Sequence, residues 1–279
     1  MATPVTPQER REELKLVYEQ ARACVRCREL ASTRTQVVFG AGNADADLMF
    51  VGEAPGANED RMGLPFVGQA GKLLDQLLSE IGLERRSVFI CNVLKCRPPG
   101  NRDPHPGEIE ACREYLMRQL ELVQPRVVCT LGNFATKLLR GDPAGITRVH
   151  GREEVRVIGR RAVRLYPLYH PAAALYTPRM LEILRADFHG IPAVLAKPAP
   201  PQPEIVEPDE PEPQEADWRD ALAAALAEPP PPTEPAVVQP SLLAGLEPPA
   251  PPPETAADPP APEPEAEQPR PGPEQLGLF

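Results

Sequence analysis

The sequence predicts an α/β fold in which helices cover both faces of a mostly parallel sheet. Through residues 1–197, short apolar runs of strand length alternate with longer amphipathic segments of helical periodicity. This alternation is typical of parallel sheets whose strands are joined by crossover helices. A sharp change in composition after residue 197 separates this body from a proline-rich, acidic segment.

The first part of the body contains a predicted helix, a strand and a second helix. Residues 6–9 read TPQE, a capping box with proline in the first helical position, and the helix that follows ends near Cys24. Residues 47–52 form a short apolar strand that stops at a glycine. Residues 71–83 place leucines and an isoleucine on one face, which predicts an amphipathic helix.

The rest of the body continues the alternation of strands and helices. In chain order it contains a strand at 87–92, a helix at 107–123, a strand at 126–132, a helix at 133–139, paired strands within 154–171 and a last helix at 178–188. In open parallel sheets, ligands bind at the carboxyl ends of the strands. We therefore expect GEAPG (52–56), Asn92, the LGN turn (131–133) and His170 to lie along one rim.

The composition changes abruptly at residue 198. Residues 198–279 hold 25 of the 39 prolines and carry 17 acidic against 2 basic side chains, whereas residues 1–197 carry 28 basic against 23 acidic. A segment so poor in aromatic residues cannot bury enough apolar surface to offset its ordering entropy. We predict one folded domain at 1–197 and a disordered tail at 198–279, with apolar islands at 217–227 and 241–246.

The sequence also indicates where the protein works. No apolar run reaches the roughly 18 residues of a membrane span, and the first residues lack the apolar core of a secretory signal. We therefore expect a cytoplasmic monomer with no membrane contact. Disulfides are rare in that compartment, so the six cysteines are expected to be reduced.

The cysteines fall into two groups. Cys91 and Cys129 lie within apolar strands and are expected to be small buried residues. The other four are Cys24 and Cys27, a C-x2-C pair at a helix end, and Cys96 and Cys112, which flank a loop rich in proline and glycine. Four thiolates suit either zinc or an iron–sulfur cluster, and the spacing leaves both open.

Four further motifs bear on function. GEAPG (52–56) and GLPFVGQAG (63–71) contain many glycines but lack the endings of phosphate-binding and dinucleotide-binding loops. Together with NVLKCRPPGNRDP (92–104) and YHPAAAL (169–175), and in this order, they resemble the family 4 uracil-DNA glycosylases, the iron–sulfur type of bacteria and archaea. The resemblance covers roughly residues 10–195.

The resemblance implies a fold, an activity and a cofactor. The fold would be a three-layer α/β/α sandwich around a central, mostly parallel four-stranded sheet. The activity would be hydrolysis of the N-glycosidic bond of uracil flipped out of DNA, which starts base-excision repair. The cofactor would be a 4Fe–4S cluster bound by Cys24, Cys27, Cys96 and Cys112.

The resemblance also implies roles for single residues in binding uracil. Phe66 would stack on the flipped base, and Asn92 would donate to uracil O4 and accept from N3–H. Glu59 would lie near C5, where the methyl group of thymine would collide. His170 would stabilise the negative charge that develops at O2. Each residue type also has an ordinary structural use, such as a core Phe, a turn Asn or a solvated Glu.

The role of Glu53 is left open at this stage. With Gly52 it belongs to the loop that the resemblance assigns to uracil binding. Its carboxylate could activate water, stabilise the sugar cation or serve only the structure of the loop.

A wedge loop is expected to enter the DNA gap left by the base. It comprises Pro171, Ala172, Ala173, Ala174 and Leu175. The cations Lys95, Arg97 and Arg102 could face phosphates. His105 lacks the basic context of relatives that trap the sugar covalently, so turnover is expected.

The last residues suggest a protein partner. Gln275, Leu276, Leu278 and Phe279 form a QLGLF sequence that resembles the motif by which bacterial repair proteins bind the sliding clamp. Two alternatives to the enzyme remain: a catalytically weak cluster protein that binds DNA as a scaffold, and a zinc-binding interaction protein. The set of Phe66, Asn92 and His170 argues against the scaffold.

Overall fold

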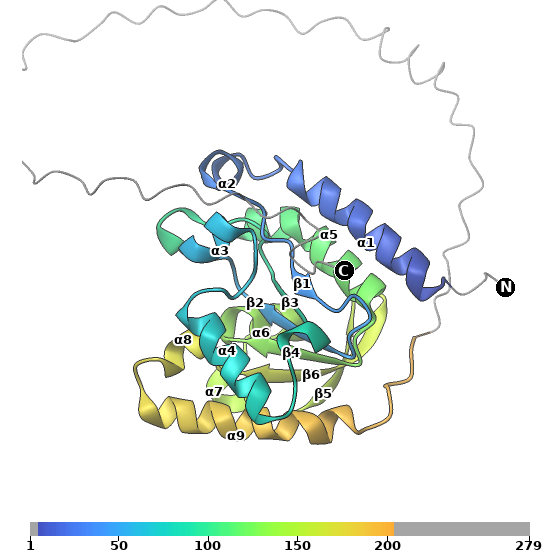
Figure 1. The fold of residues 1–279 in the computed structure, drawn as a ribbon, viewed down its shortest axis with the longest axis vertical. Coiled ribbons are helices and arrows are strands. Elements are labelled where there is room, and N and C mark those ends of the chain that lie inside the picture. The colour runs from blue at the N-terminus through green and yellow to red at the C-terminus, as the bar shows by residue number, and fades with distance from the viewer. Residues whose placement is uncertain (1–4, 204–279) are drawn as a thin grey trace, which may run out of the picture. The chain divides into compact units, whose positions relative to one another are not determined.

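A computed structural model describes residues 5–203 of the chain (Figure 1). The predicted tail, its apolar islands and the QLGLF motif at 275–279 lie outside the described residues. Within residues 5–203, no helix is long and apolar enough to cross a lipid bilayer.

The centre of the domain is a six-stranded sheet in the order β1-β3-β2-β4-β6-β5. Its four inner strands are parallel: β3 (Phe89–Asn92), β2 (Leu48–Gly52), β4 (Val127–Leu131) and β6 (Arg161–Leu168). These are the strands that the apolar runs predicted. Antiparallel edge strands β1 (Ala41–Gly42) and β5 (Glu154–Ile158) extend the four parallel strands to six. β1 was missed because two residues carry no periodic signal.

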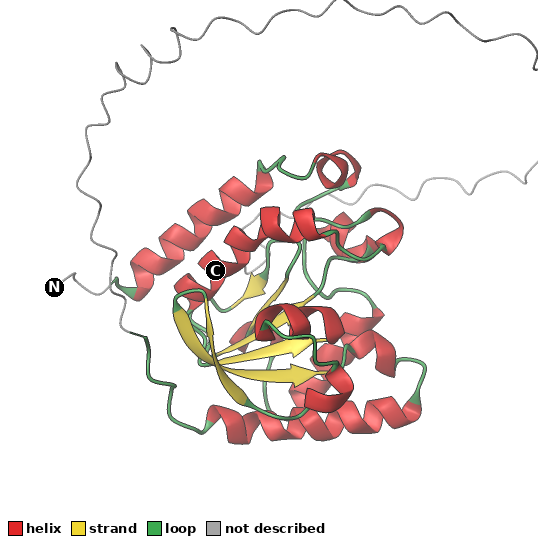
Figure 2. Ribbon diagram, turned by 180° about the vertical axis from the view of Figure 1, so that it is seen from behind, coloured by secondary structure: helices red, strands yellow, loops and turns green. Residues whose placement is uncertain are grey.

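Helices cover both faces of this sheet, which makes the three predicted layers (Figure 2). Strand β2 shows why, because its side chains alternate between two separate cores. Met49 and Val51 pack with residues of α1 (Pro7–Arg22) and α5 (Pro106–Val123). Leu48 and Phe50 pack with residues of α4 (Gln69–Glu80) and α9 (Pro178–Leu195). A strand buried on both faces reads as a continuous apolar run, as the sequence does here.

The long helices α1, α4 and α5 begin and end close to the predicted positions, whereas α9 continues seven residues beyond the predicted end at 188, to Leu195. α1 begins with the capping box, in which the Thr6 side chain accepts from the Glu9 amide and the Glu9 side chain accepts from the Thr6 amide. α6 (Asn133–Arg140) follows β4 directly. The shorter elements were not predicted: α2 (Arg28–Thr33), α3 (Ala57–Met62), α7 (Ile146–Val149), α8 (Pro171–Ala174), and the 3-10 turns η1 (Arg85–Ser87) and η2 (Pro99–Asn101).

The last described residues return to the start of β6. The Gln202 side chain accepts from the Ala162 amide at 3.1 Å and donates to the Ala162 carbonyl at 2.9 Å. Arg164 donates to the Pro198 carbonyl at 2.9 Å. Because Ala162 lies near the first residue of β6, the described chain ends at the amino ends of the parallel strands.

Candidate active site and four-cysteine site

A cavity of about 450 Å³ opens at the carboxyl ends of β2, β3 and β6. The structure brings five of the six predicted uracil-binding residues to its walls: Glu53, Glu59, Phe66, Asn92 and His170. The convergence expected from topology is therefore found at this rim. The LGN turn instead lines a neighbouring hollow of about 610 Å³, which shares Glu53 and His170 with the cavity.

Gly52 lies beneath the cavity and allows its walls to approach one another. It pairs with Asn92 across the parallel strands β2 and β3. A Cβ atom at this position would lie 2.3 Å from Asn92 Oδ1 and 2.7 Å from Phe66 Cζ. Glycine is required here because any side chain would collide with Asn92 and Phe66, and not because the backbone adopts a positive φ.

Asn92 presents an acceptor without a partner. Its side chain is only 2% exposed, and its Oδ1 atom has no hydrogen bond to any described residue. Leaving a buried acceptor unpaired costs about 1–3 kcal/mol, and buried polar groups are rarely left so. Because Asn92 also lines the cavity, a ligand that brought a donor to this amide would satisfy its acceptor.

Phe66 occupies a strained loop position. Its φ is 51°, in the left-handed region that bulky residues rarely adopt. Arg85 donates to the Phe66 carbonyl at 2.9 Å and also to the Pro65 carbonyl, which holds the loop from outside. Gly71 makes room for the loop, because a Cβ there would lie 1.8 Å from the Phe66 carbonyl oxygen.

Glu59 holds the same loop from the cavity side. Its Oε1 atom accepts from the amides of Val67 and Gly68, each at 2.8 Å. Its other oxygen faces Gly56, where a Cβ would lie 2.7 Å away. Glu59 is therefore not a freely solvated acid, and its carboxylate fixes the backbone that carries Phe66.

His170 is held as a neutral ring with a defined tautomer. Burial lowers its pKa to about 4, although the charge of Glu59 opposes this shift. Its Nδ1 atom accepts from the Ala172 amide at 3.1 Å, so the proton of the neutral ring is on Nε2. The ring lies 5.6 Å from the Phe66 ring, measured between centroids. His170 thus offers an N–H donor close to the stacking side chain.

Glu53 lies between the cavity and the neighbouring hollow. Burial, and to a smaller extent the negative charge of Asp103, raise the pKa of its carboxyl group above the usual range. A carboxylate with a raised pKa is a stronger base than a solvated one.

One wall of the cavity comes from the loop between Cys96 and Cys112, and the sequence did not predict it. Pro98, Asn101 and Arg102 line the cavity from this loop. Arg102 is held by two acids: its guanidinium donates to Glu108 at 2.6 and 3.0 Å and to Glu29 at 2.8 Å. The clamp joins the loop to α2 and α5.

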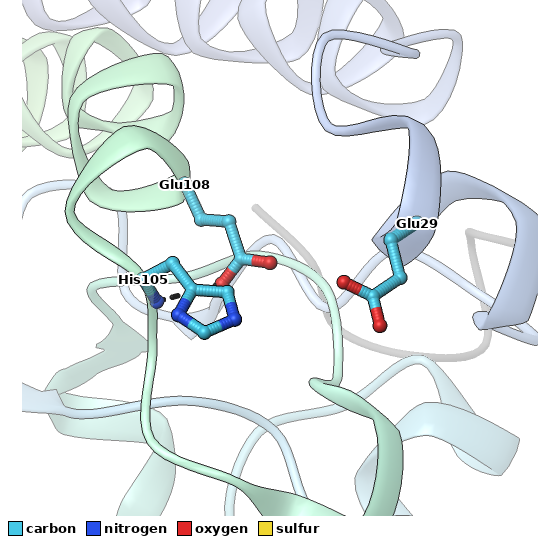
Figure 3. Close-up of side chains that lie close together, drawn as sticks. All are labelled: Glu29, His105 and Glu108. Atoms are coloured by element: carbon cyan, nitrogen blue, oxygen red, sulfur yellow. Dashed lines mark hydrogen bonds between the residues drawn. The ribbon is translucent and has the colours of Figure 1, made fainter.

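The same two acids lie close to His105 (Figure 3). The ligand atoms of Glu29, His105 and Glu108 lie within 4.8 Å of one another. Glu108 also accepts from the His105 amide at 2.8 Å, as the dashed line shows. Because Arg102 already binds both carboxylates, we interpret this group as an ion-pair cluster that closes the loop.

The four predicted ligand cysteines surround a second, small cavity between α2, α5 and the loop that begins at Cys96. Two of their sulfur atoms already accept hydrogen bonds. Arg34 donates to Cys96 Sγ at 3.3 Å, and the Lys95 amide donates to Cys112 Sγ at 3.3 Å. Burial raises the pKa of the Cys112 thiol to about 11, against the lowering effect of the Lys95 charge.

Two further predictions on cysteines and cations can be compared with the structure. Cys91 and Cys129 are fully buried within β3 and β4, as expected. Lys95 was expected to face phosphates, and this prediction is wrong: its side chain is 1% exposed. Arg97 donates to Asn101 at 2.8 Å, and Arg102 is held by its two acids.

The predicted wedge loop forms the short helix α8 beside the cavity. Pro171 and Ala174 are buried, and Leu175 is 37% exposed. The next residue, Tyr176, is 88% exposed, which is unusual for a large aromatic ring. The sequence analysis did not single out Tyr176, although an aromatic residue next to the predicted wedge loop was a usable signal.

Comparisons with known proteins identify the family to which the chain is similar. The profile of the uracil DNA glycosylase superfamily matches residues 39–189. The chain is 48% identical to a type-4 uracil-DNA glycosylase of Sulfurisphaera tokodaii, over 64% of this chain and 83% of the relative. It is 45% identical to a type-4 uracil-DNA glycosylase of Archaeoglobus fulgidus, over 68% of this chain and 96% of the relative.

A third type-4 uracil-DNA glycosylase, from Thermotoga maritima, is 43% identical over 60% of this chain and 85% of the relative. The matched residues contain the cavity, and they carry both its strand-end residues and its loop wall. This chain belongs to the uracil DNA glycosylase superfamily, and within it to the type-4 enzymes.

Proposed function

We propose that the 450 Å³ cavity holds uracil extruded from DNA and that the enzyme hydrolyses its N-glycosidic bond there. An enzyme that acts on a base must take it out of the stack, because the reacting atoms are not accessible within the duplex. Extrusion costs less for the weakly paired uracil opposite guanine. The product is an abasic site, the first intermediate of base-excision repair.

The observation that carries this proposal is the unpaired Oδ1 atom of Asn92. Oδ1 can accept from uracil N3–H while Nδ2 donates to O4. Cytosine presents an acceptor at N3 and a donor at C4, so both contacts would be lost. The buried amide would then remain unpaired, at about 1–3 kcal/mol for each group.

His170 and Phe66 complete the environment of the base. The Nε2–H of neutral His170 would donate to uracil O2, where negative charge develops as the base leaves. Because Nδ1 is engaged by the Ala172 amide, the ring cannot turn its proton away without losing that bond. Phe66 would stack on the base, at a position fixed by Glu59 and Arg85.

Glu53 has the properties of a general base or of a stabiliser of the sugar cation. Its partly buried carboxyl group has a raised pKa and borders both hollows at the rim. From there it could take a proton from the attacking water as the N-glycosidic bond breaks. The wedge, Pro171–Leu175, would occupy the gap in the duplex, with Leu175 exposed for this contact.

The test is a strand-cleavage assay on a labelled duplex with one U·G pair, followed by alkali. We expect cleavage only at uracil, with kcat/KM lower by about 100-fold or more in Asn92→Ala and His170→Ala. Asn58→Ala, at an exposed asparagine of α3, is the control. Unchanged cleavage by both cavity variants would overturn the proposal.

We propose that Cys24, Cys27, Cys96 and Cys112 bind a 4Fe–4S cluster. Their convergence, their burial and the hydrogen bonds to two sulfur atoms support this donor set. The cluster would hold the loop that forms one cavity wall.

We propose that QLGLF at 275–279 binds the sliding clamp in a reducing, cytoplasmic setting. This motif lies outside the described residues, and its apolar and aromatic side chains support the proposal from sequence alone. Replacing Leu278 and Phe279 by alanine should abolish clamp retention in a pull-down while uracil release stays unchanged. Retention equal to wild type would overturn it.

A further inference from the structure

Lys95 is a buried cation without an acidic partner. Its side chain is 1% exposed, and its Nζ atom donates to the Asn92 carbonyl and to Gln119 Oε1, each at 2.6 Å. Its ammonium group also lies 5.9 Å from the centroid of the Phe39 ring. None of the ion pairs found in residues 5–203 includes Lys95, although buried lysines are rarely left without a counter-charge.

Lys95 also lines the small cavity that the four cysteines surround. The Lys95 amide donates to Cys112 Sγ at 3.3 Å, and the positive charge opposes the effect of burial on the pKa of the Cys112 thiol. The charge acts in the same direction on Cys91. Cys96 has its own cation, Arg34, at 3.3 Å. Four cysteine thiolates bring more negative charge than an iron–sulfur core neutralises, so a cation on the inner side would compensate it.

Lys95 also contacts a residue of the proposed uracil cavity, because its Nζ atom binds the backbone of Asn92. The Asn92 carbonyl that Lys95 binds belongs to the residue whose side chain lines the cavity with an unpaired Oδ1. Gln119, the second partner of Lys95, donates to the Phe39 carbonyl at 2.9 Å and is itself fully buried. Lys95 is therefore held from two sides, and in turn it holds the end of β3.

We propose that Lys95 is a positioning residue that connects the two sites: its charge offsets that of the four-cysteine centre, and its Nζ atom fixes the Asn92 backbone so that the amide faces uracil. The proposal rests on the proposed cluster and on the proposed reading of uracil by Asn92. It assigns to one buried side chain both the electrostatic environment of the cluster and the precision of base recognition.

The experiment compares full-length wild type with Lys95→Met and Lys95→Arg, with Lys72→Met at an exposed lysine of α4 as the control. Iron content and visible absorption are recorded first. The reduction potential of the cluster is then measured by voltammetry, and kcat and KM are measured on the U·G duplex. Methionine has nearly the length of lysine but no charge. Arginine keeps the charge, but its larger guanidinium group cannot reproduce the contacts of Nζ with the Asn92 carbonyl and Gln119.

We expect Lys95→Met to shift the reduction potential to more negative values, because removing a nearby positive charge disfavours the added electron. We also expect kcat/KM to fall about tenfold, mainly through KM, because Asn92 contacts the base before and during the reaction. Lys95→Arg should keep the wild-type potential and still raise KM. Lys72→Met should change neither quantity.

Several results would overturn the proposal or one of its parts. Lys95→Met with the wild-type potential and KM would exclude both parts, and equal shifts of potential in both variants would exclude charge as the cause. If Lys95→Met does not fold, Lys95→Arg alone tests the proposal. A reduction potential of Lys95→Arg that differs from wild type would overturn the charge part. A wild-type KM in Lys95→Arg would overturn the positioning part. Wild type without iron would overturn the charge part together with the cluster. Wild type that binds iron but releases no uracil would overturn the proposed activity, and the potentials would still decide the charge part.

Discussion

The uracil cavity and the four-cysteine site share one segment of chain but are built on opposite principles. Residues 92–112 contribute Asn92 and a wall to the cavity, and Cys96 and Cys112 to the other site. In the cavity an acceptor is left unpaired, whereas the cysteine sulfurs already receive donors from Arg34 and Lys95. This difference fits the two proposed roles, an exchangeable base in the cavity and a resident cofactor among the cysteines.

The largest effect that we expect in comparing the two sites is loss of the proposed cofactor from the four-cysteine site. Cys112→Ser should remove nearly all iron and the absorption near 400 nm, because a hydroxyl group is a poor ligand for an iron–sulfur cluster. Cys129→Ala, at a fully buried cysteine of β4, is the matched control and should keep its iron. Equal iron content in both variants would remove Cys112 from the site.

The second effect tests whether the cavity depends on close approach. In Gly52→Ala the new methyl group would lie 2.3 Å from Asn92 Oδ1 and 2.7 Å from Phe66 Cζ, so one of them must move. We expect kcat/KM to fall by about 100-fold, because misplacement by about 1 Å has that cost, while iron content stays unchanged. Gly107→Ala, where a Cβ meets nothing within 4 Å, is the control. Wild-type activity in Gly52→Ala would contradict this packing.

The third effect concerns the support of Phe66. Glu59→Gln keeps the shape of the side chain but removes the charge that accepts from the Val67 and Gly68 amides. Hydrogen bonds to charged groups contribute about 1.5–3 kcal/mol, so we expect kcat/KM to fall about tenfold. Glu110→Gln, at an exposed acid of α5, should have no effect.

Glu59 was also predicted to exclude thymine, and a further variant, Glu59→Ala, tests this. Release of thymine from a T·G pair by Glu59→Ala would support a position near C5 of the base. Loss of uracil release without any thymine release would leave only the loop support that the structure describes.

The smallest expected effect is a shift in pH dependence. Glu53 would act as a carboxylate, so activity should be lost as the pH falls through its raised pKa. Asp103→Asn removes one cause of that shift and should move the acidic limb of kcat/KM to lower pH, with no change at pH 7. An acidic limb that survives in Glu53→Gln would contradict direct catalysis by Glu53.

The regular parts of the fold could be predicted from sequence because they repeat a pattern. Strands buried on both faces read as apolar runs, and α4 and α5 show one apolar face. Elements of two to six residues, such as β1 and α2, carry no period to detect. The rim residues Asn92 and His170 were predictable because each follows a parallel strand.

The rest of the site depends on contacts between distant residues. Arg34 binds Cys96 across 62 positions, and Arg85 binds the Phe66 carbonyl across 19. Lys95 looked like a surface cation because it precedes a loop of prolines and glycines, and only the packed structure shows its partners. Sequence patterns indicate which residue types suit a site, but they do not show which charge is buried.

The path of the described chain beyond α9 determines where residues 197–203 lie relative to the cavity. The hydrogen bonds of Gln202 to Ala162 fix residues 197–203 behind the sheet, at the end opposite to the cavity. Whatever follows residue 203 therefore starts from the rear of the domain. A duplex bound at the proposed rim site would therefore lie at the end of the domain opposite to the point from which residue 204 continues.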